Sequence, residues 1–276
     1  QKIAYVTGGM GGIGTAICHR LHKMGYKVIA GCGPSRDFDK WLGEQKAMGY
    51  TFYASVGNVA DWASTTEAFS KAVAEHGPID VLVNNAGILR DRSFKKMTLS
   101  DWDLVLQVHL SGTAYVTRAA WPHMNEQGYG RIVLTSSSSG IYGNFGQANY
   151  GAAKMGMLGL MNVLALEGAK NNVRVNTLAP AAATRMISTI PGRDINPDSP
   201  PPESAPKLVS PAVLFMTSDE APTGAVINAG GGRYYRAQIF VNDPIDLGVE
   251  ASFEDLMANT ESLMDMSQAK PKTGGV

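Results

Sequence analysis

Short runs of apolar and β-branched residues alternate with longer amphipathic stretches along most of the chain. The short runs predict strands at residues 3–6, 27–30, 51–55, 79–83, 131–135, 173–178 and 225–229. The longer stretches predict helices at residues 12–24, 38–48, 61–76, 99–124, 149–170, 208–217 and 253–268. Strands that alternate with helices build βαβ units, and right-handed crossovers place the helices on both faces of a parallel sheet. The pattern therefore predicts an α/β fold, a single doubly wound Rossmann domain with about seven parallel strands.

The alternation stops near residue 190, where the sequence becomes rich in proline. Residues 190–206 hold six prolines, each of which fixes φ and removes a backbone donor, so no continuous helix fits there. Two interpretations stay open: a surface loop, or a lid over a site, since long irregular loops are often functional. We expect a Rossmann domain over residues 1–232 and an extension over 233–276 that packs on or beyond this domain, with a frayed tail from residue 271.

Composition narrows the classes of protein to which the chain can belong. Hydrophobic residues make up 44% of the chain and charged residues 17%, so a sizeable core can be buried. The 24 basic and 24 acidic side chains cancel, which argues against a nucleic-acid binder, because such a protein needs a basic face. No run of about 18 apolar residues could span a membrane. Cys18 and Cys32 form neither a disulfide framework nor a metal-ligand spacing, and no signal peptide is visible, so we expect a cytoplasmic protein without a metal site.

The first predicted strand runs directly into a glycine-rich turn that opens a helix. Gly9, Gly11 and Gly14 satisfy the spacing G-x-G-x-x-G, and Gly8, Gly12 and Gly14 satisfy G-x-x-x-G-x-G. A dinucleotide pyrophosphate needs backbone amides at close range and the positive end of a helix dipole, and glycine permits that approach. The position of the turn, at the first strand-to-helix junction, indicates a dinucleotide site. Its candidate residues are Gly8, Gly11, Gly12, Ile13 and Gly14.

The end of the second strand indicates which nicotinamide cofactor the turn would bind. Enzymes that use NAD place a carboxylate there to accept a hydrogen bond from the ribose 2′-hydroxyl, whereas enzymes that use NADP offer an arginine. No carboxylate occurs here before Asp37, and Ser35 and Arg36 could hold a 2′-phosphate. We therefore expect NADP(H), with NAD(H) as the alternative. The structural alternative is that Arg36 is a solvated loop charge and that Asp37 caps the next helix.

A tyrosine and a lysine lie four residues apart at the start of a long predicted helix. This spacing puts Tyr150 and Lys154 on one helix face. An ammonium beside a phenol favours the phenolate, so we expect Lys154 to lower the pKa of Tyr150 from about 10 toward neutrality. Such a tyrosine can pass a proton to a carbonyl oxygen. Ser137 lies 13 residues upstream of Tyr150, just past a predicted strand, and its hydroxyl could hold a substrate carbonyl.

These motifs identify the chain as similar to the short-chain dehydrogenase/reductase family. The matching positions are Gly8, Gly12, Gly14, the sequence Asn84-Asn85-Ala86-Gly87, Ser137, Tyr150 and Lys154. The resemblance covers roughly residues 2 to 186. It implies that Tyr150 is the acid/base, that Lys154 also binds the nicotinamide ribose and that Ser137 orients the carbonyl. The further cofactor contacts that it implies are Asn58, Val59, Asn85, Ala86, Gly87, Pro180 and Thr184.

Two positions depart from the family pattern. His109 stands where most of the family has an asparagine that holds a proton-relay water. We treat His109 as a candidate relay residue; the alternative is that it bonds the backbone and keeps a helix kink. Pro180-Ala181 replaces the common Pro-Gly, which would alter the loop over the nicotinamide.

The two halves of the chain resemble two groups within the family. Residues 2 to about 97 are similar to bacterial NADPH-dependent acetoacetyl-CoA reductases, as in Ala30-Gly31-Cys32-Gly33-Pro34. The sequence from about residue 101 is similar to the (3R)-hydroxyacyl-CoA dehydrogenase domain of the peroxisomal multifunctional enzyme, as in Gly140-Ile141-Tyr142-Gly143. The resemblance implies an oxidoreductase that interconverts 3-oxoacyl-CoA and (3R)-3-hydroxyacyl-CoA with NADP(H).

Several features of substrate and assembly follow as expectations. Gly143, Asn144 and Phe145, with Ser137 and Tyr150, would contact the acyl-CoA substrate. The alternatives are a carrier-bound acyl chain, a steroid or a small ketone, or a family scaffold that binds the cofactor without turnover. The resemblance also implies a homodimer or homotetramer built on the helices at 99–124 and 149–170.

Overall fold

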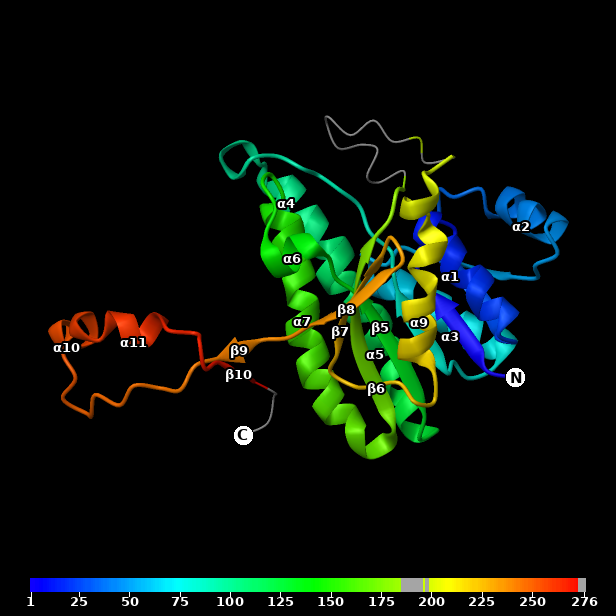
Figure 1. The fold of residues 1–276 in the computed structure, drawn as a ribbon. Coiled ribbons are helices and arrows are strands. Elements are labelled where there is room, and N and C mark those ends of the chain that lie inside the picture. The colour runs from blue at the N-terminus through cyan, green and yellow to red at the C-terminus, as the bar shows by residue number, and fades with distance from the viewer. Residues whose placement is uncertain (185–195, 197–198, 273–276) are drawn as a thin grey trace. The chain divides into compact units, whose positions relative to one another are not determined.

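The computed structural model describes residues 1–184, 196 and 199–272. The chain divides into two compact units, Gln1–Arg236 and Ala237–Val276 (Figure 1). No helix in the described ranges has the length and apolar character to cross a bilayer.

The first unit is built on one mostly parallel sheet. Its strands are β1 (Ile3–Val6), β2 (Lys27–Cys32), β3 (Tyr53–Val56), β4 (Val81–Asn84), β5 (Gly130–Thr135), β6 (Val173–Ala181), β7 (Val226–Gly230) and β8 (Arg233–Ala237). Their order across the sheet is β3-β2-β1-β4-β5-β6-β7-β8. The seven predicted strands are all present, and β8 adds an eighth that the sequence did not suggest. The order reverses between β1 and β4, and ligands of such sheets bind at this reversal, beyond the carboxyl ends of the strands.

Helices flank this sheet, as the Rossmann prediction requires (Figure 1). They are α1 (Gly12–Lys23), α2 (Phe38–Ala47), α3 (Trp62–His76), α4 (Leu99–Leu106), α5 (Gly112–Glu126), α6 (Ser138–Tyr142), α7 (Ala148–Gly168) and α9 (Ser210–Thr217). Short 3₁₀ turns are η1 (Phe94–Lys96), η3 (Ala169–Asn171), η4 (Pro202–Ser204) and η5 (Pro206–Leu208). Asp37, Asp61 and Thr98 each accept a hydrogen bond from a backbone N–H in the first turn of α2, α3 and α4. The described part of the proline-rich segment thus forms short turns rather than a helix.

The long helix predicted at 99–124 is interrupted. A π-helical turn, η2 (Gln107–Ser111), separates α4 from α5, and the buried His109 lies inside it. A π turn aims a side chain in a direction that an unbroken α-helix would not reach, and such turns often occur at functional sites.

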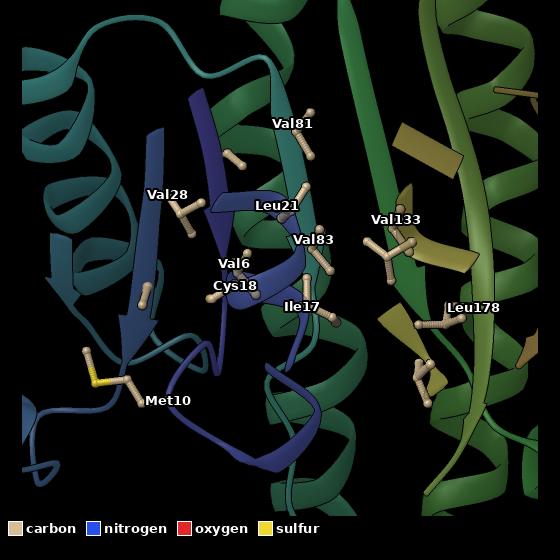
Figure 2. Close-up of a cluster of buried hydrophobic side chains, with 14 of the residues drawn as sticks. Val6, Met10, Ile17, Cys18, Leu21, Val28, Val81, Val83, Val133 and Leu178 are labelled. Carbon is tan, nitrogen blue, oxygen red and sulfur yellow. The ribbon is translucent and has the colours of Figure 1, made fainter. Parts of the chain in front are cut away.

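A core of aliphatic side chains holds α1 against the sheet (Figure 2). Ile17 and Leu21 of α1, Val28 of β2 and Val83 of β4 have no solvent exposure. Burying such a side chain contributes roughly 1.5–3 kcal/mol. The helix that follows the glycine turn is therefore fixed firmly relative to the strand that precedes it.

In its described residues, the second unit holds two short helices and a pair of short antiparallel strands. Strand β9 (Phe240–Val241) pairs antiparallel with β10 (Lys270–Pro271). The single helix predicted at 253–268 is wrong: α10 (Phe253–Ala258) and α11 (Thr260–Met264) are separated at Asn259, whose φ of −105° lies outside the helical range. The frayed tail predicted from residue 271 is wrong at Pro271, which lies in β10, and residues 273–276 lie outside the described part of the chain. How the extension packs stays a prediction.

Candidate active site

The glycine turn after β1 is closed so tightly that side chains are excluded. Gly8 has a φ of +60°, which favours glycine. A Cβ on Gly14 would collide with the carbonyl oxygen of Gly8, and a Cβ on Gly9 would lie 2.9 Å from Cα of Ala30. The first turn of α1 therefore approaches the loop closely, which leaves its free N–H groups open to an anion.

A cavity of about 330 Å³ lies over this turn. The predicted residues that line it are Gly8, Gly11, Gly12, Ile13, Gly14, Arg36, Asn85, Ala86, Gly87, His109, Tyr150, Lys154, Pro180 and Thr184. A neighbouring cavity of about 290 Å³ contains Asn58 and Val59, and Gly8, Gly33 and Ala86 line both. The two cavities bring the predicted pyrophosphate, adenine and nicotinamide contacts together at the carboxyl edge of the sheet, so these residues fit a nicotinamide dinucleotide.

The end of β2 presents a cation to this site. Arg36 lines the cavity, its Nη2 donates to the carbonyl oxygen of Met10 at 3.2 Å, and its Nε is buried without a partner among the described residues. A buried guanidinium nitrogen left unpaired is costly, which argues that an anion belongs beside it. None of the described residues that line either cavity is a carboxylate. Ser35 is exposed and lies outside both cavities, and Asp37 caps α2 through Lys40 N at 3.0 Å, as one alternative anticipated.

Three side chains predicted to act in catalysis meet beyond β5. Ser137 caps α6, the short helix that follows β5, and its hydroxyl is hydrogen-bonded to Tyr150. Lys154, one turn along α7 from Tyr150, is buried, and its Nζ donates to the carbonyl oxygen of Thr135 at 2.7 Å. The Nζ atom lies 5.5 Å from the centroid of the Tyr150 ring. The lysine is thus beside the phenol but bonded to the backbone.

The expected direction of the Tyr150 pKa is wrong. Burial raises the pKa of Tyr150 to about 12, although the hydrogen bond with Ser137 lowers it in part and the carboxylate of Asp91 adds to the rise. Burial also lowers the pKa of Lys154 to about 7, so this amine is only partly charged at neutral pH. Loss of water around both groups therefore outweighs the charge effect that the spacing suggested, and Tyr150 is a protonated donor.

His109 is hydrogen-bonded to the backbone of the loop that follows β4. Its Nε2 lies 2.7 Å from the carbonyl oxygen and 3.0 Å from the amide nitrogen of Ile88, while its Nδ1 is buried with no partner among the described residues. Its ring stands edge-on to Tyr150, with centroids 5.1 Å apart. Burial, with a contribution from Lys154, lowers the pKa of His109 to about 3, so the imidazole is neutral. The backbone bond and the irregular helix agree with the structural alternative for this residue.

A larger cavity of about 730 Å³ adjoins the cofactor cavity, and Tyr150, Ile13, Pro180 and Thr184 line both. Ser137, Gly143 and Asn144 line the larger cavity, as predicted for substrate contacts. Phe145 does not line any of these three cavities and is 92% exposed, so the structure does not bring it to the site. Glu203 and Ser204, from the described part of the proline-rich segment, do line it. Residues 190–195, 197 and 198 of the suggested lid lie outside the described residues.

Comparison with known proteins decides the family. Residues 2–191 match the family described as short chain dehydrogenase. The chain belongs to the short-chain dehydrogenase family. Within this family it is 45% identical over 248 residues to the acetoacetyl-CoA reductase of Cupriavidus necator, covering 84% of this chain and 98% of that protein. It is 43% identical over 241 residues to the peroxisomal multifunctional enzyme type 2 of Mus musculus, covering 84% of this chain and 32% of that protein.

A solved structure supports the same assignment. The short chain dehydrogenase from Mycobacterium avium is 33% identical in sequence and matches with a TM-score of 0.82, covering 98% of this chain and 96% of that chain. The family assignment makes the chain an oxidoreductase that uses a nicotinamide cofactor.

Some residues of this dehydrogenase site escaped the sequence analysis. Met10, Cys32 and Thr135 line the cofactor cavity. Glu203 and Arg233 line the larger cavity. Cys32 is the last residue of β2, a position at which the sequence pattern predicted only the presence or absence of a charge. A signal for Arg233 was the run of three glycines before it, which permits a tight turn back over the sheet edge.

Proposed function

We propose that this short-chain dehydrogenase reduces 3-oxoacyl-CoA, such as acetoacetyl-CoA, to (3R)-3-hydroxyacyl-CoA with NADPH, and catalyses the reverse reaction with NADP⁺. One observation carries the proposal: protonated Tyr150, hydrogen-bonded to Ser137, stands where the cofactor cavity joins the larger cavity. The relatives named acetoacetyl-CoA reductase support the choice of substrate.

Each side chain of the site has its own role in the proposed reaction. The Ser137 hydroxyl orients the substrate carbonyl, and the Tyr150 phenol donates its proton to the carbonyl oxygen. When bound, the nicotinamide cofactor supplies the hydride to the carbonyl carbon. Lys154 would hold the nicotinamide ribose. His109 fixes the Ile88 backbone and packs against the Tyr150 ring, so it would hold the tyrosine in place.

The raised pKa of Tyr150 favours the reductive direction. Reduction needs a phenol that carries its proton, and a pKa of about 12 keeps that proton in place at neutral pH. Oxidation of the alcohol needs the phenolate as a base, which this environment disfavours.

The choice of NADPH rests on Arg36. Arg36 lines the cofactor cavity, its Nε has no partner among the described residues, and an arginine at this position suits a 2′-phosphate. Arg36→Ala should raise the KM for NADPH by about tenfold or more while leaving the KM for NADH nearly unchanged, since losing a charged hydrogen bond costs about 1.5–3 kcal/mol.

The test is consumption of NADPH, followed at the nicotinamide absorbance band with acetoacetyl-CoA and, in parallel, with a steroid ketone and a small neutral ketone. Turnover of acetoacetyl-CoA above the other ketones supports the proposal. A folded protein that binds NADPH and turns over none of them contradicts it. Tyr150→Phe should abolish turnover and spare NADPH binding, because the phenol oxygen is the only group removed.

We further propose a homodimer or homotetramer in the cytoplasm. Apolar side chains of α7, Met155, Val163 and Leu166, are between 40% and 58% exposed on this chain, which suits a helix-to-helix interface. Light scattering that gives the mass of one chain would contradict the assembly.

A further inference from the structure

The turn between β7 and β8 brings an arginine to the larger cavity. Strand β7 runs parallel to β6, with Gly230 opposite Ala181, so both strands end at the carboxyl edge of the sheet. Gly231 and Gly232 then have φ values of +59° and +72°. Two successive residues with positive φ form the tight turn typical of a two-residue hairpin. Strand β8 therefore begins at Arg233, directly over the edge where the active site lies.

Arg233 is available to bind an anion. Its side chain lines the larger cavity together with Tyr150, is exposed, and makes no hydrogen bond or ion pair with any described residue. Among the described residues that line this cavity it is the sole cation, and Glu203 is the sole carboxylate. Glu203 lies beside the same turn, since a Cβ on Gly231 would be 3.4 Å from its carbonyl oxygen. It likewise makes no ion pair with a described residue, so the two charges do not cancel by contact.

A small neutral ketone has no negative charge that the Arg233 guanidinium could bind. The cavity, at about 730 Å³, is also large for an acetoacetyl group alone. An acyl-CoA fills more of such a space and carries phosphate groups at the far end of its pantetheine arm. A planar guanidinium binds phosphate oxygens in pairs, which gives both affinity and orientation.

We propose that Arg233 binds a phosphate of the substrate's phosphopantetheine arm and so makes the enzyme prefer CoA thioesters over ketones without a phosphate. This inference rests on the proposed function. Glu203 opposes the same anion by charge, so it limits how tightly the product is held. Arg233 is thus a residue for specificity that touches the substrate far from the reacting carbonyl.

The experiment compares substrates that share the ketone and differ in the phosphate. Acetoacetyl-CoA, acetoacetyl-4′-phosphopantetheine and acetoacetyl-pantetheine are assayed with wild-type enzyme and Arg233→Gln. The variant should raise the KM for acetoacetyl-CoA on the order of 5-fold, as for loss of one partly solvated ion pair, and leave kcat within about 2-fold. The KM for acetoacetyl-pantetheine should not change. A similar KM increase for acetoacetyl-4′-phosphopantetheine would support a contact with its single phosphate. An increase for acetoacetyl-CoA alone would overturn the proposal, because the contact would then be with the nucleotide part of CoA.

Two further variants act as controls. Arg236→Gln removes the same charge from the same strand, but Arg236 lines a different cavity with Phe215 and Tyr235, so the KM for acetoacetyl-CoA should stay at the wild-type value. Glu203→Gln should lower that KM, and added salt should reduce both effects by screening. Equal changes for the CoA and pantetheine thioesters, or no change in Arg233→Gln, would overturn the proposal. If wild-type enzyme reduces no acetoacetyl thioester at all, the proposed function itself is what fails.

Discussion

The contact between Gly87 and His109 gives the most direct test of the site's geometry. Gly87 has no unusual φ, so its backbone would accept an alanine. However, the three nearest atoms to a Cβ built there all belong to the His109 ring, and the closest, Cε1, overlaps it. This ring cannot move aside easily, because its Nε2 is bonded to the Ile88 backbone and its other edge meets Tyr150.

The expected changes in the free energy of unfolding can be estimated from how tightly this contact is packed. Gly87→Ala should lower the free energy of unfolding by about 1–3 kcal/mol, the usual cost of an extra methyl group in a full core. His109→Ala should cost about 2–4 kcal/mol, since it leaves a cavity and removes the hydrogen-bond partner of one Ile88 backbone group. In the double variant the new methyl group enters the space that the ring has left. It should therefore be about as stable as His109→Ala alone, so that the two changes couple by roughly 1–3 kcal/mol.

Urea unfolding of the wild-type protein, Gly87→Ala, His109→Ala and the double variant measures this coupling. The unfolding is followed by far-UV circular dichroism. Gly14→Ala is the matched control: its Cβ would meet backbone atoms of Gly8 and Gly9, which His109→Ala does not release. The costs of Gly14→Ala and His109→Ala should therefore add. If the costs of Gly87→Ala and His109→Ala also simply add, the ring does not lie where the structure has it.

Three more predictions concern protons and a helix. Because the folded protein holds the pKa of His109 near 3 instead of 6.5, its free energy of unfolding should fall as the pH drops from 6.5 toward 3, and His109→Asn should show a shallower fall over that range in urea melts. The rate of alcohol oxidation should keep rising with pH above 9 while the rate of ketone reduction stays flat, since only oxidation needs the Tyr150 phenolate; parallel pH profiles would contradict this. Gly43→Ala, in α2 with nothing near its Cβ, should raise the free energy of unfolding by up to about 1 kcal/mol, and a lower midpoint in urea would refute it.

The helices and strands of the first unit could be predicted from the sequence because the residues that determine where each one starts and ends are close together in the chain. Strand β1 is apolar throughout and is followed at once by glycines, and α3 starts at a capping Asp61 and ends at Gly77, whose φ of +106° stops the helix. Each of these signals depends on a few neighbouring residues, and tertiary packing reinforced them. The eighth strand and the break at Asn259 were missed because Arg-Tyr-Tyr-Arg and an amphipathic run gave no comparable local signal.

Contacts at the site were predicted less evenly, since they depend on distance in space. The glycines, Tyr150 and Lys154 were found because a short spacing alone brings them together. Phe145 was predicted to contact the substrate because it follows Gly143 and Asn144 in the sequence. The structure leaves its side chain exposed, since packing decides whether a loop side chain turns inward and the sequence alone does not show that packing. Arg233 was overlooked for the opposite reason, because it reaches the site only through a turn far along the chain.

The Tyr150–Lys154 pair shows where inference from spacing stops. Four residues of separation on a helix fix the direction in which two side chains point, and so they predict a lysine near the phenol. The sign of the resulting pKa shift depends on how much water both groups lose, which is a property of everything packed around them. Here Lys154 is buried, gives a hydrogen bond to Thr135 and is itself drawn toward neutrality, so it has less charge with which to stabilise a phenolate. A pair that spacing presents as an activated base is therefore, in this fold, better suited to donating a proton.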